Sequence, residues 1–267
     1  MIASMVLIAE AKAQVSGPLV LPGAVPPAAE VPPDATRRAP QRPRGESTQA
    51  STLPRGIKDA KHYHHGSAPG TQGELEIIGQ LPGTLGLHIT ATGRVISSPG
   101  ETCAIDLGAD SPAPMLRIEE RYRTTRYRLQ SPVCPLVVEL LPNSVRISIP
   151  DGECAFVRAD CRLSPDGVWG PTAEDLMGRT AAIERQRGRA ENEMRDTSRK
   201  LLRRLSGEDQ RQVAAEQAAF SSERTTTCRS YVGEDQHGFC AAELTSARVE
   251  HLKQRYEQTP ERPPRNR

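Results

Sequence analysis

Aromatic side chains are scarce in this chain of 267 residues, at 3% of positions with a single tryptophan, Trp169. Any hydrophobic core must therefore consist mainly of aliphatic side chains. The charges nearly cancel, with a formal net charge of +2. Dedicated nucleic-acid-binding domains usually show a clear basic excess, so the composition argues against that class and we expect no nucleic-acid partner.

Long apolar runs and catalytic motifs are also absent. No stretch reaches the roughly 18 apolar residues that a membrane-spanning helix needs, so we expect no membrane span. The sequence contains no G-x-S-x-G, H-E-x-x-H, P-loop or G-x-G-x-x-G motif. His88 and His237 have no nearby cysteine that we expect to stay reduced. We therefore predict a protein that is not an enzyme, without catalytic residues, cofactor or metal.

The six cysteines contain no C-x-x-C pair, the spacing that zinc sites and redox motifs usually need. A disulfide framework in an oxidising compartment fits better. Four of the six lie close in sequence and allow three pairings: Cys103, Cys134, Cys154 and Cys161. On an extended strand Cys154 and Cys161 would lie about 23 Å apart, whereas a disulfide spans roughly 7 Å between Cα atoms. That pair would need a turn and is not favoured.

The other two cysteines, Cys228 and Cys240, flank a short polar loop between two helical patterns. The first pattern is a stripe at i, i+3, i+7 and i+11, formed by Gln217, Phe220, Arg224 and Cys228. The second repeats at i, i+4 and i+8, at Leu244, Arg248 and Leu252. Gly233 and Gly238 allow the chain to reverse between them. We predict two antiparallel helices tied by a Cys228–Cys240 disulfide, with Arg224 and Arg248 on facing helices, pairing with glutamates or capping loop carbonyls.

The first 13 residues resemble the remnant of a secretory signal. Residues 5–9 are apolar, and Ala11, Lys12 and Ala13 form an A-x-A cleavage pattern. The segment has no basic start and its apolar run is short, which a start codon assigned too far downstream would explain. An accidental apolar start is the alternative. A secretory signal would direct the protein to the periplasm or the extracellular space.

Residues 14–73 are rich in proline and poor in large apolar side chains. This composition predicts a disordered, extended spacer. A histidine tract lies within it, at His62, His64 and His65. Histidine clusters can bind metals, but no carboxylate or thiol lies beside this one, so we interpret it as a solvated polar tract.

Between residues 74 and 163 the apolar residues alternate with a period of two, and Gly, Pro and Asn punctuate them as turns. Short strands at this spacing predict a small antiparallel β sandwich or barrel. Residues 133–141 are more continuously apolar, so we place them centrally. Residues 121–129 alternate basic with aromatic or threonine residues, which fits either a cationic binding strand or a sheet with one solvated face.

Residues 164–258 form a predicted helical domain, which makes the fold class α+β. Pro and Gly break any regular element over residues 164–172, and we place Trp169 there, capping a core where the two parts meet or stacking on a ligand. No proline occurs from 172 to 259. We predict helices from 172 to 205, up to about 228, and from about 241 to 256. Residues 259–267 form a frayed tail. The β and helical domains are expected to have separate cores.

The C-terminal pattern resembles the LprI-type lysozyme-inhibitor family of bacterial envelope proteins. The resemblance covers roughly residues 161–256 and rests on the cysteine-anchored hairpin with Gln217, Phe220, Arg224, Leu244, Thr245 and Arg248, and on Trp169 in the segment ahead of the helices. The family usually has an aromatic residue, often Trp, at the position of Phe220. The resemblance implies binding and blocking of a lysozyme-like enzyme, but it supplies no inhibitory residues to carry over.

Two functions follow as expectations. The first is a secreted, periplasmic inhibitor that occludes the cleft of a lysozyme-like protein. Lysozymes of the common animal type are usually basic, so the loop acids Glu234 and Asp235 are the expected contact. The second is a structural or stress-related envelope protein without an enzyme target, for which peptidoglycan contact is the expected behaviour.

Overall fold

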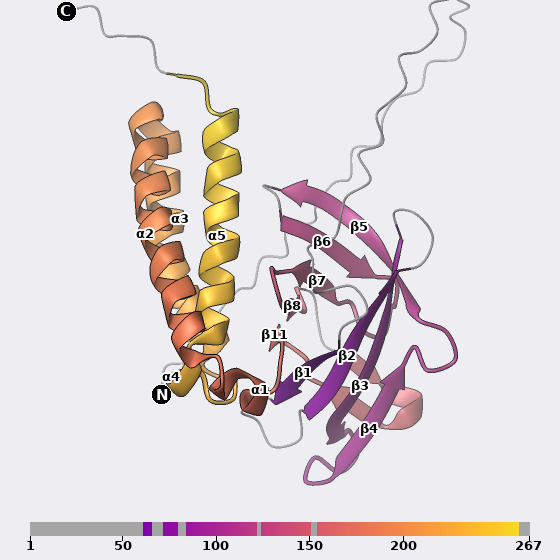
Figure 1. Cartoon of the computed structure of the whole chain (residues 1–267). Helices are drawn as coiled ribbons and strands as arrows, with labels where there is room; N and C mark the ends of the chain where they lie inside the picture. Colours follow the sequence, from indigo (N-terminus) through magenta and orange to yellow (C-terminus); the bar gives the residue numbers. More distant parts are fainter. Residues whose placement is uncertain (1–60, 66–71, 80–83, 122–123, 151–153, 262–267) are drawn as a thin grey trace, which may run out of the picture. The chain divides into compact units, whose positions relative to one another are not determined.

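A computed structural model describes residues 61–65, 72–79, 84–121, 124–150 and 154–261 (Figure 1). The predicted signal remnant at 1–13 and residues 14–60 of the predicted spacer lie outside these ranges, as do residues 262–267 of the tail. All described residues belong to one compact unit. It contains an antiparallel sheet followed by a set of helices.

The sheet part contains eleven strands and one short 3-10 helix among the described residues. The long strands follow the period-two pattern of the sequence. The bounds are β1 Lys61–His65, β2 Gln72–Gly79, β3 Leu85–Val95, β4 Thr102–Leu107, β5 Ala113–Arg121, β6 Thr124–Leu129, β7 Val137–Leu140, β8 Val145–Ser148, β9 Cys154–Phe156, η1 Val157–Ala159, β10 Cys161–Leu163 and β11 Gly167–Trp169.

All strand pairs are antiparallel, in the order β1-β2-β3-β5-β6-β7-β8-β11. Strand β4 pairs with β3, and β10 pairs with both β3 and β9. The two ends of the path, β1 and β11, lie next to each other, so the sheet curls nearly into a barrel. The predicted antiparallel β part is therefore present, in a nearly closed form.

The core of the sheet is made by the inward-facing residues of the alternating strands. Leu75, Ile77, Leu87 and Met115 are fully buried, and Trp169 from β11 joins the same cluster. At Gly93 of β3 a Cβ atom would collide with the carbonyl oxygen of Arg162 in β10. A glycine here lets the two strands pair in close contact.

Strand β1 corrects the predicted extent of disorder. Lys61–His65 falls within the predicted spacer, yet it pairs along β2, with Lys61 opposite Glu76 and His62 opposite Leu75. His62 is only 2% exposed, so it is not the solvated residue that we predicted. The side chains of His64 and His65 lie outside the described part of the chain. Main-chain pairing with the strand that follows gives order that composition does not reveal.

The helices begin and end close to the predicted positions. The bounds are α1 Ala173–Met177, α2 Thr180–Arg204, α3 Gly207–Cys228, α4 Glu234–His237 and α5 Phe239–Gln258. Thr172 is the N-cap of α1, and its hydroxyl accepts from the Asp175 backbone N–H at 3.2 Å. A short break at Gly178 and Arg179 divides the predicted first helix into α1 and α2.

The three long helices run side by side (Figure 1), and α2 packs most extensively on α5. Their common cluster consists of Ala190, Met194, Leu201, Val213, Val249 and Leu252. By contrast, α3 buries only Val213 and Cys228. Helix α5 is thus the central helix, and α3 is the most exposed of the three.

The helices also share a cluster with the sheet. Leu141 and Val168 from the sheet part pack with Cys228, Cys240, Leu244 and Ala247. The sheet and the long helices each have a cluster of their own as well, but the prediction of fully separate cores is wrong at this junction. Strand β11 pairs with β8, so the sheet also continues beyond the predicted boundary after residue 163.

All six cysteines are paired. Cys103 pairs with Cys161 and Cys134 with Cys154, so the disfavoured Cys154–Cys161 pairing does not occur. Cys228 and Cys240 form the predicted disulfide, with their Cα atoms 5.5 Å apart. Two bonds therefore lie within the sheet part and one ties α3 to α5.

Candidate functional site

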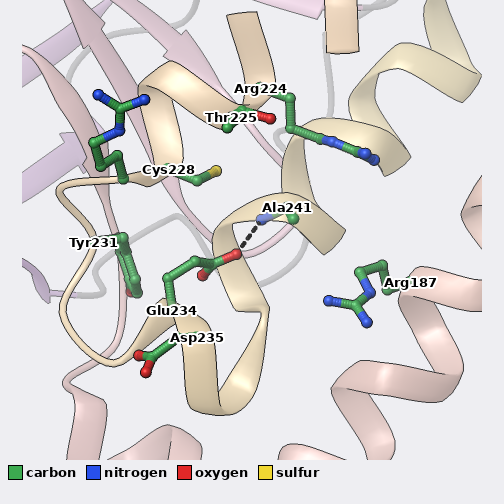
Figure 2. A pocket seen from close by; sticks show the side chains of 9 residues that line it. Arg187, Arg224, Thr225, Cys228, Tyr231, Glu234, Asp235 and Ala241 are labelled. Carbon is green, nitrogen blue, oxygen red and sulfur yellow. Dashed lines mark hydrogen bonds between the residues drawn. The ribbon is translucent and has the colours of Figure 1, made fainter. Parts of the chain in front are cut away.

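The strongest candidate site lies at the disulfide-tied end of the helices. It is an open pocket of about 570 Å³, which we call the loop pocket (Figure 2). Its wall combines residues of α2, α3, α4, α5 and the loop after α3: Arg187, Arg224, Thr225, Cys228, Arg229, Tyr231, Glu234, Asp235 and Ala241. Three arginines face two carboxylates, and the disulfide lies in the wall.

Two glycines fix the shape of the loop that forms the pocket. Gly233 and Gly238 flank α4 with φ of 73° and 65°, in the left-handed region that favours glycine. Gly238 also lies under Arg187, since a Cβ atom there would approach Nη1 of Arg187 to 2.7 Å. The chain therefore reverses twice within a few residues, and α4 is held between α3 and α5.

Glu234 caps the N-terminus of α5 from inside the pocket. Its carboxylate accepts from the backbone N–H groups of Cys240 and Ala241, each at 2.9 Å. Figure 2 shows the bond to Ala241. A carboxylate is favourable at a helix N-terminus, where N–H groups lack intrahelical partners. Burial raises the pKa of Glu234, while the two backbone N–H groups and the Arg187 charge oppose that rise.

Tyr231 and His237 form the packed base of the loop. The Tyr231 hydroxyl donates to the Pro171 carbonyl oxygen at 2.8 Å, and burial raises the pKa of Tyr231. Nδ1 of His237 accepts from the Phe239 N–H at 3.2 Å, so Nε2 carries the proton that is donated to the Val232 carbonyl at 2.9 Å. Both ring nitrogens of His237 thus serve loop structure.

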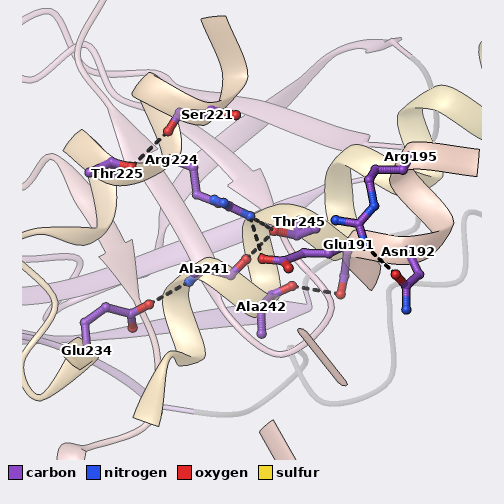
Figure 3. A network of polar contacts seen from close by, with 11 residues as sticks. Glu191, Asn192, Arg195, Ser221, Arg224, Thr225, Glu234, Ala241, Ala242 and Thr245 are labelled. Atoms are coloured by element: carbon purple, nitrogen blue, oxygen red, sulfur yellow. Dashed lines mark hydrogen bonds and ion pairs between the residues drawn. The ribbon is translucent and has the colours of Figure 1, made fainter. Parts of the chain in front are cut away.

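The residues of the family-like stripe meet those of the second helical run, as predicted. Arg224 donates to Glu191 at 3.3 Å and to the Thr245 hydroxyl at 2.8 Å (Figure 3). Thr245 in turn donates to the Ala241 carbonyl at 2.6 Å. Arg224 therefore links α2, α3 and α5 behind the loop pocket, and its predicted pairing with a glutamate is confirmed.

Phe220 is the centre of a second group of contacts made by the stripe. Arg224 and Arg248 place their guanidinium carbons 5.7 and 5.8 Å from the centre of its ring, within cation–π range. Nε of Arg248 donates to Gln217 at 3.3 Å, and Nη2 lies 3.7 Å from Glu216. The motif positions are therefore structural contacts between α3 and α5, and of the stripe only Arg224 and Cys228 line the loop pocket.

The remaining predicted site residues divide into buried and exposed groups. Trp169 is fully buried, and its indole N–H donates to the Pro165 carbonyl at 2.8 Å. Burial rules out the alternative in which it stacks on a ligand from solvent. Asp235 is exposed and makes no hydrogen bond or ion pair within the described ranges. Of the two predicted contact acids, Asp235 is therefore the one with a free carboxylate.

Five residues that line the loop pocket were not among the predicted site residues: Arg187, Thr225, Arg229, Tyr231 and Ala241. Arg187 lies 37 positions before Arg224, in a helix with many charges. Nothing in such a charged pattern distinguishes a residue that faces a pocket from one that faces solvent. Only the packing of α2 on α5 places Arg187 beside the loop.

The described ranges contain no group of three or more His, Cys, Asp and Glu side chains arranged to hold a metal ion. Within the same part of the chain, no helix combines the length and apolar character that crossing a membrane requires. Comparison with protein-family models, curated proteins and solved structures gives no match. The function must therefore be argued from the geometry of the chain itself.

Proposed function

We propose that this chain is a binding protein of the bacterial cell envelope that resembles the LprI-type lysozyme inhibitors and acts by occlusion, without catalysis. The observation that carries the proposal is the loop pocket, a preformed concave surface closed by a disulfide and presented at one end of the helices. Rigid surfaces favour tight binding because little conformational entropy is lost on association.

The three disulfides support an extracytoplasmic location, since such bonds persist in oxidising compartments. Among extracytoplasmic locations, the periplasm is the compartment that fits the signal-like start and the family resemblance. Lysozyme-like enzymes act on the cell wall, so an envelope protein would meet them there.

The charges around the loop pocket support a contact with a glycoside hydrolase. These enzymes commonly place two carboxyl groups in the substrate cleft. Arg187 and Arg229 border the pocket and would complement such a cleft. Exposed Asp235 lies among the same lining residues and would meet basic groups at the rim of a lysozyme. Glu234 contributes to shape instead, because its carboxylate caps α5.

A muramidase assay with the purified full chain and several lysozyme types tests the proposal. We expect inhibition at micromolar concentrations, and weaker inhibition after reduction and alkylation of the disulfides. No inhibition of any type at these concentrations would reject the proposal. Retention on isolated peptidoglycan without lysozyme binding would favour the alternative, a structural or stress-related envelope protein.

A further inference from the structure

The arginines of the loop pocket differ in how their guanidinium groups are used. Arg224 is committed to Glu191 and Thr245. The guanidinium groups of Arg187 and Arg229 donate no hydrogen bond and form no ion pair in the part of the chain that the structure describes. Figure 2 shows Arg187 reaching from α2 towards the pocket. Two cationic groups with fixed planar donor geometry therefore border the pocket without an anionic partner.

Glu234 does not supply that partner. Its carboxylate accepts the backbone N–H groups at the start of α5, and the Arg187 charge acts on it only through space. Arg187 is also half-buried, and it lies over the backbone of Gly238. A partly desolvated guanidinium gains more from an anion than a fully solvated one, because less water screens the interaction.

The other walls of the pocket are apolar or neutral: the Tyr231 ring, the disulfide at Cys228, Ala241 and Thr225. The volume of about 570 Å³ lies within the range of roughly 300–1,000 Å³ typical of small-ligand sites. The pocket therefore has room for an apolar stem as well as for a charged head group.

We propose that the loop pocket binds a carboxylate carried on a short apolar stem, with Arg187 and Arg229 as its cationic anchors. Arginine forms strong, bidentate hydrogen bonds with carboxylates. Because Arg224 is paired with Glu191, Arg187 and Arg229 are the guanidinium groups left for a ligand, and a monoanion meets the least repulsion from the two lining carboxylates. A phosphate dianion would be repelled more strongly by Glu234 and Asp235 at the same wall.

The source of the carboxylate rests on the proposed function: an acidic side chain in the cleft of a lysozyme-like partner. The pocket's chemistry can be tested separately from that source. Propionate is the probe, because it carries a carboxylate on two carbons, as a glutamate side chain does. Propionamide is its neutral counterpart of nearly the same shape.

The experiment is an NMR titration of the full chain with each probe. Propionate is expected to give saturable shifts at the backbone amides around the loop pocket, and propionamide none. The R187A/R229A variant should bind propionate at least about tenfold more weakly, the loss expected for charged hydrogen bonds. R189A is the matched control, since Arg189 is exposed on the same helix and does not line the pocket.

Equal shifts with both probes, or unchanged propionate binding in R187A/R229A, would overturn the inference. If R187A proves unstable in a thermal melt, propionate binding by the R229A single variant is the deciding measurement. Arg229 is exposed, so its replacement should leave the fold intact. The lysozyme assay is run on the same variants. Propionate binding without lysozyme inhibition would reject the proposed function and leave the carboxylate site standing. Inhibition that R187A/R229A does not weaken would leave the function standing and reject a carboxylate of the lysozyme-like partner as the ligand of the pocket.

Discussion

At the scale of single residues, Glu243 joins the sheet to the helices. It is fully buried in α5, and its carboxylate accepts from the Asn143 N–H at 2.7 Å and from the Asn143 side-chain amide at 2.9 Å. Ser144 and Gln186 lie 3.2 and 3.4 Å from the same carboxylate. Burial raises the pKa of Glu243, and these donors oppose the rise.

Replacing Glu243 with Gln should lower the free energy of unfolding by about 1–3 kcal/mol, because the amide nitrogen would face hydrogen-bond donors where an oxygen accepted them. Urea unfolding of E243Q and of wild type at the same pH measures the difference. E257Q is the control, since Glu257 is exposed on the same helix. An E243Q variant as stable as E257Q would show that the buried contacts contribute little.

Asp160 supplies a pH-dependent contribution on the sheet. It has a φ of 49°, and its carboxylate accepts from the Ser97 N–H at 3.0 Å and from the Ser97 hydroxyl. The hydrogen bonds from Ser97 lower the pKa of Asp160 from its usual 3.8. A lowered pKa in the folded state gives stability above pH 3.8 that is lost as the pH falls further.

The D160N variant should therefore lose less stability than wild type between pH 5 and pH 2. Asparagine suits the left-handed conformation and does not titrate, so it removes the pH dependence with little backbone strain. Denaturant unfolding across this interval is the measurement, with D110N at an exposed turn position as the control. Parallel curves for D160N and wild type would refute the role given to Asp160.

Neither residue could be identified from the sequence. Glu243 lies 100 positions from Asn143, and Asp160 lies 63 positions from Ser97. An acidic residue in a helix or a turn usually faces solvent, so local pattern favoured exposure for both. The cysteine pair at 228 and 240 could be predicted because its partners lie close in sequence and flank a polar loop with two glycines.

At the scale of elements, the sequence predicted the long pieces well and missed the short ones. Period-two alternation and helical stripes marked β2, β3, β4, β5, β8 and the three long helices. Strands β1, β9, β10 and β11 have three to five residues each, too few for a period of two to stand out, and main-chain pairing with other strands holds them in place. Helix α4 has four residues, too few for periodicity to appear.

Two glycine substitutions test how local backbone geometry sets the helical part. G238A should lower the free energy of unfolding by about 1 kcal/mol or more, because φ is 65° there. G188A should raise it by about 0.5–1 kcal/mol, because Gly188 lies within α2 and an added Cβ would touch nothing. Thermal unfolding of both variants measures the direction of each change in stability. A change in the same direction for both would contradict the different backbone roles given to Gly188 and Gly238.

At the scale of the whole molecule, the shared cluster makes the two parts depend on each other. Leu141 and Val168 of the sheet part contact the helices beside the Cys228–Cys240 disulfide. Glu243 adds a polar connection at the same junction. The sequence suggested independent cores because each part has its own hydrophobic period. It could not show that residues at the edges of both parts would pack together.

The C228S/C240S variant tests that dependence. Removing a bond across a loop of this length should lower the free energy of unfolding by about 2–5 kcal/mol, since the unfolded chain regains conformational freedom. The single tryptophan, Trp169, lies in the sheet core, so its fluorescence reports the sheet. Far-ultraviolet circular dichroism reports mainly the helices. If the shared cluster couples the two parts, both signals should move to lower denaturant by the same amount.

The control for this variant is a non-reduced tryptic digest, analysed by mass spectrometry. It should retain the Cys103–Cys161 and Cys134–Cys154 links, so that any change comes from the one bond removed. A Trp169 transition that stays at the wild-type midpoint while the helical signal shifts would mean that the sheet unfolds independently of the helices. The cluster around Leu141 and Val168 would then be a contact surface between two domains, and the proposed inhibition through the loop pocket would depend on the helices alone.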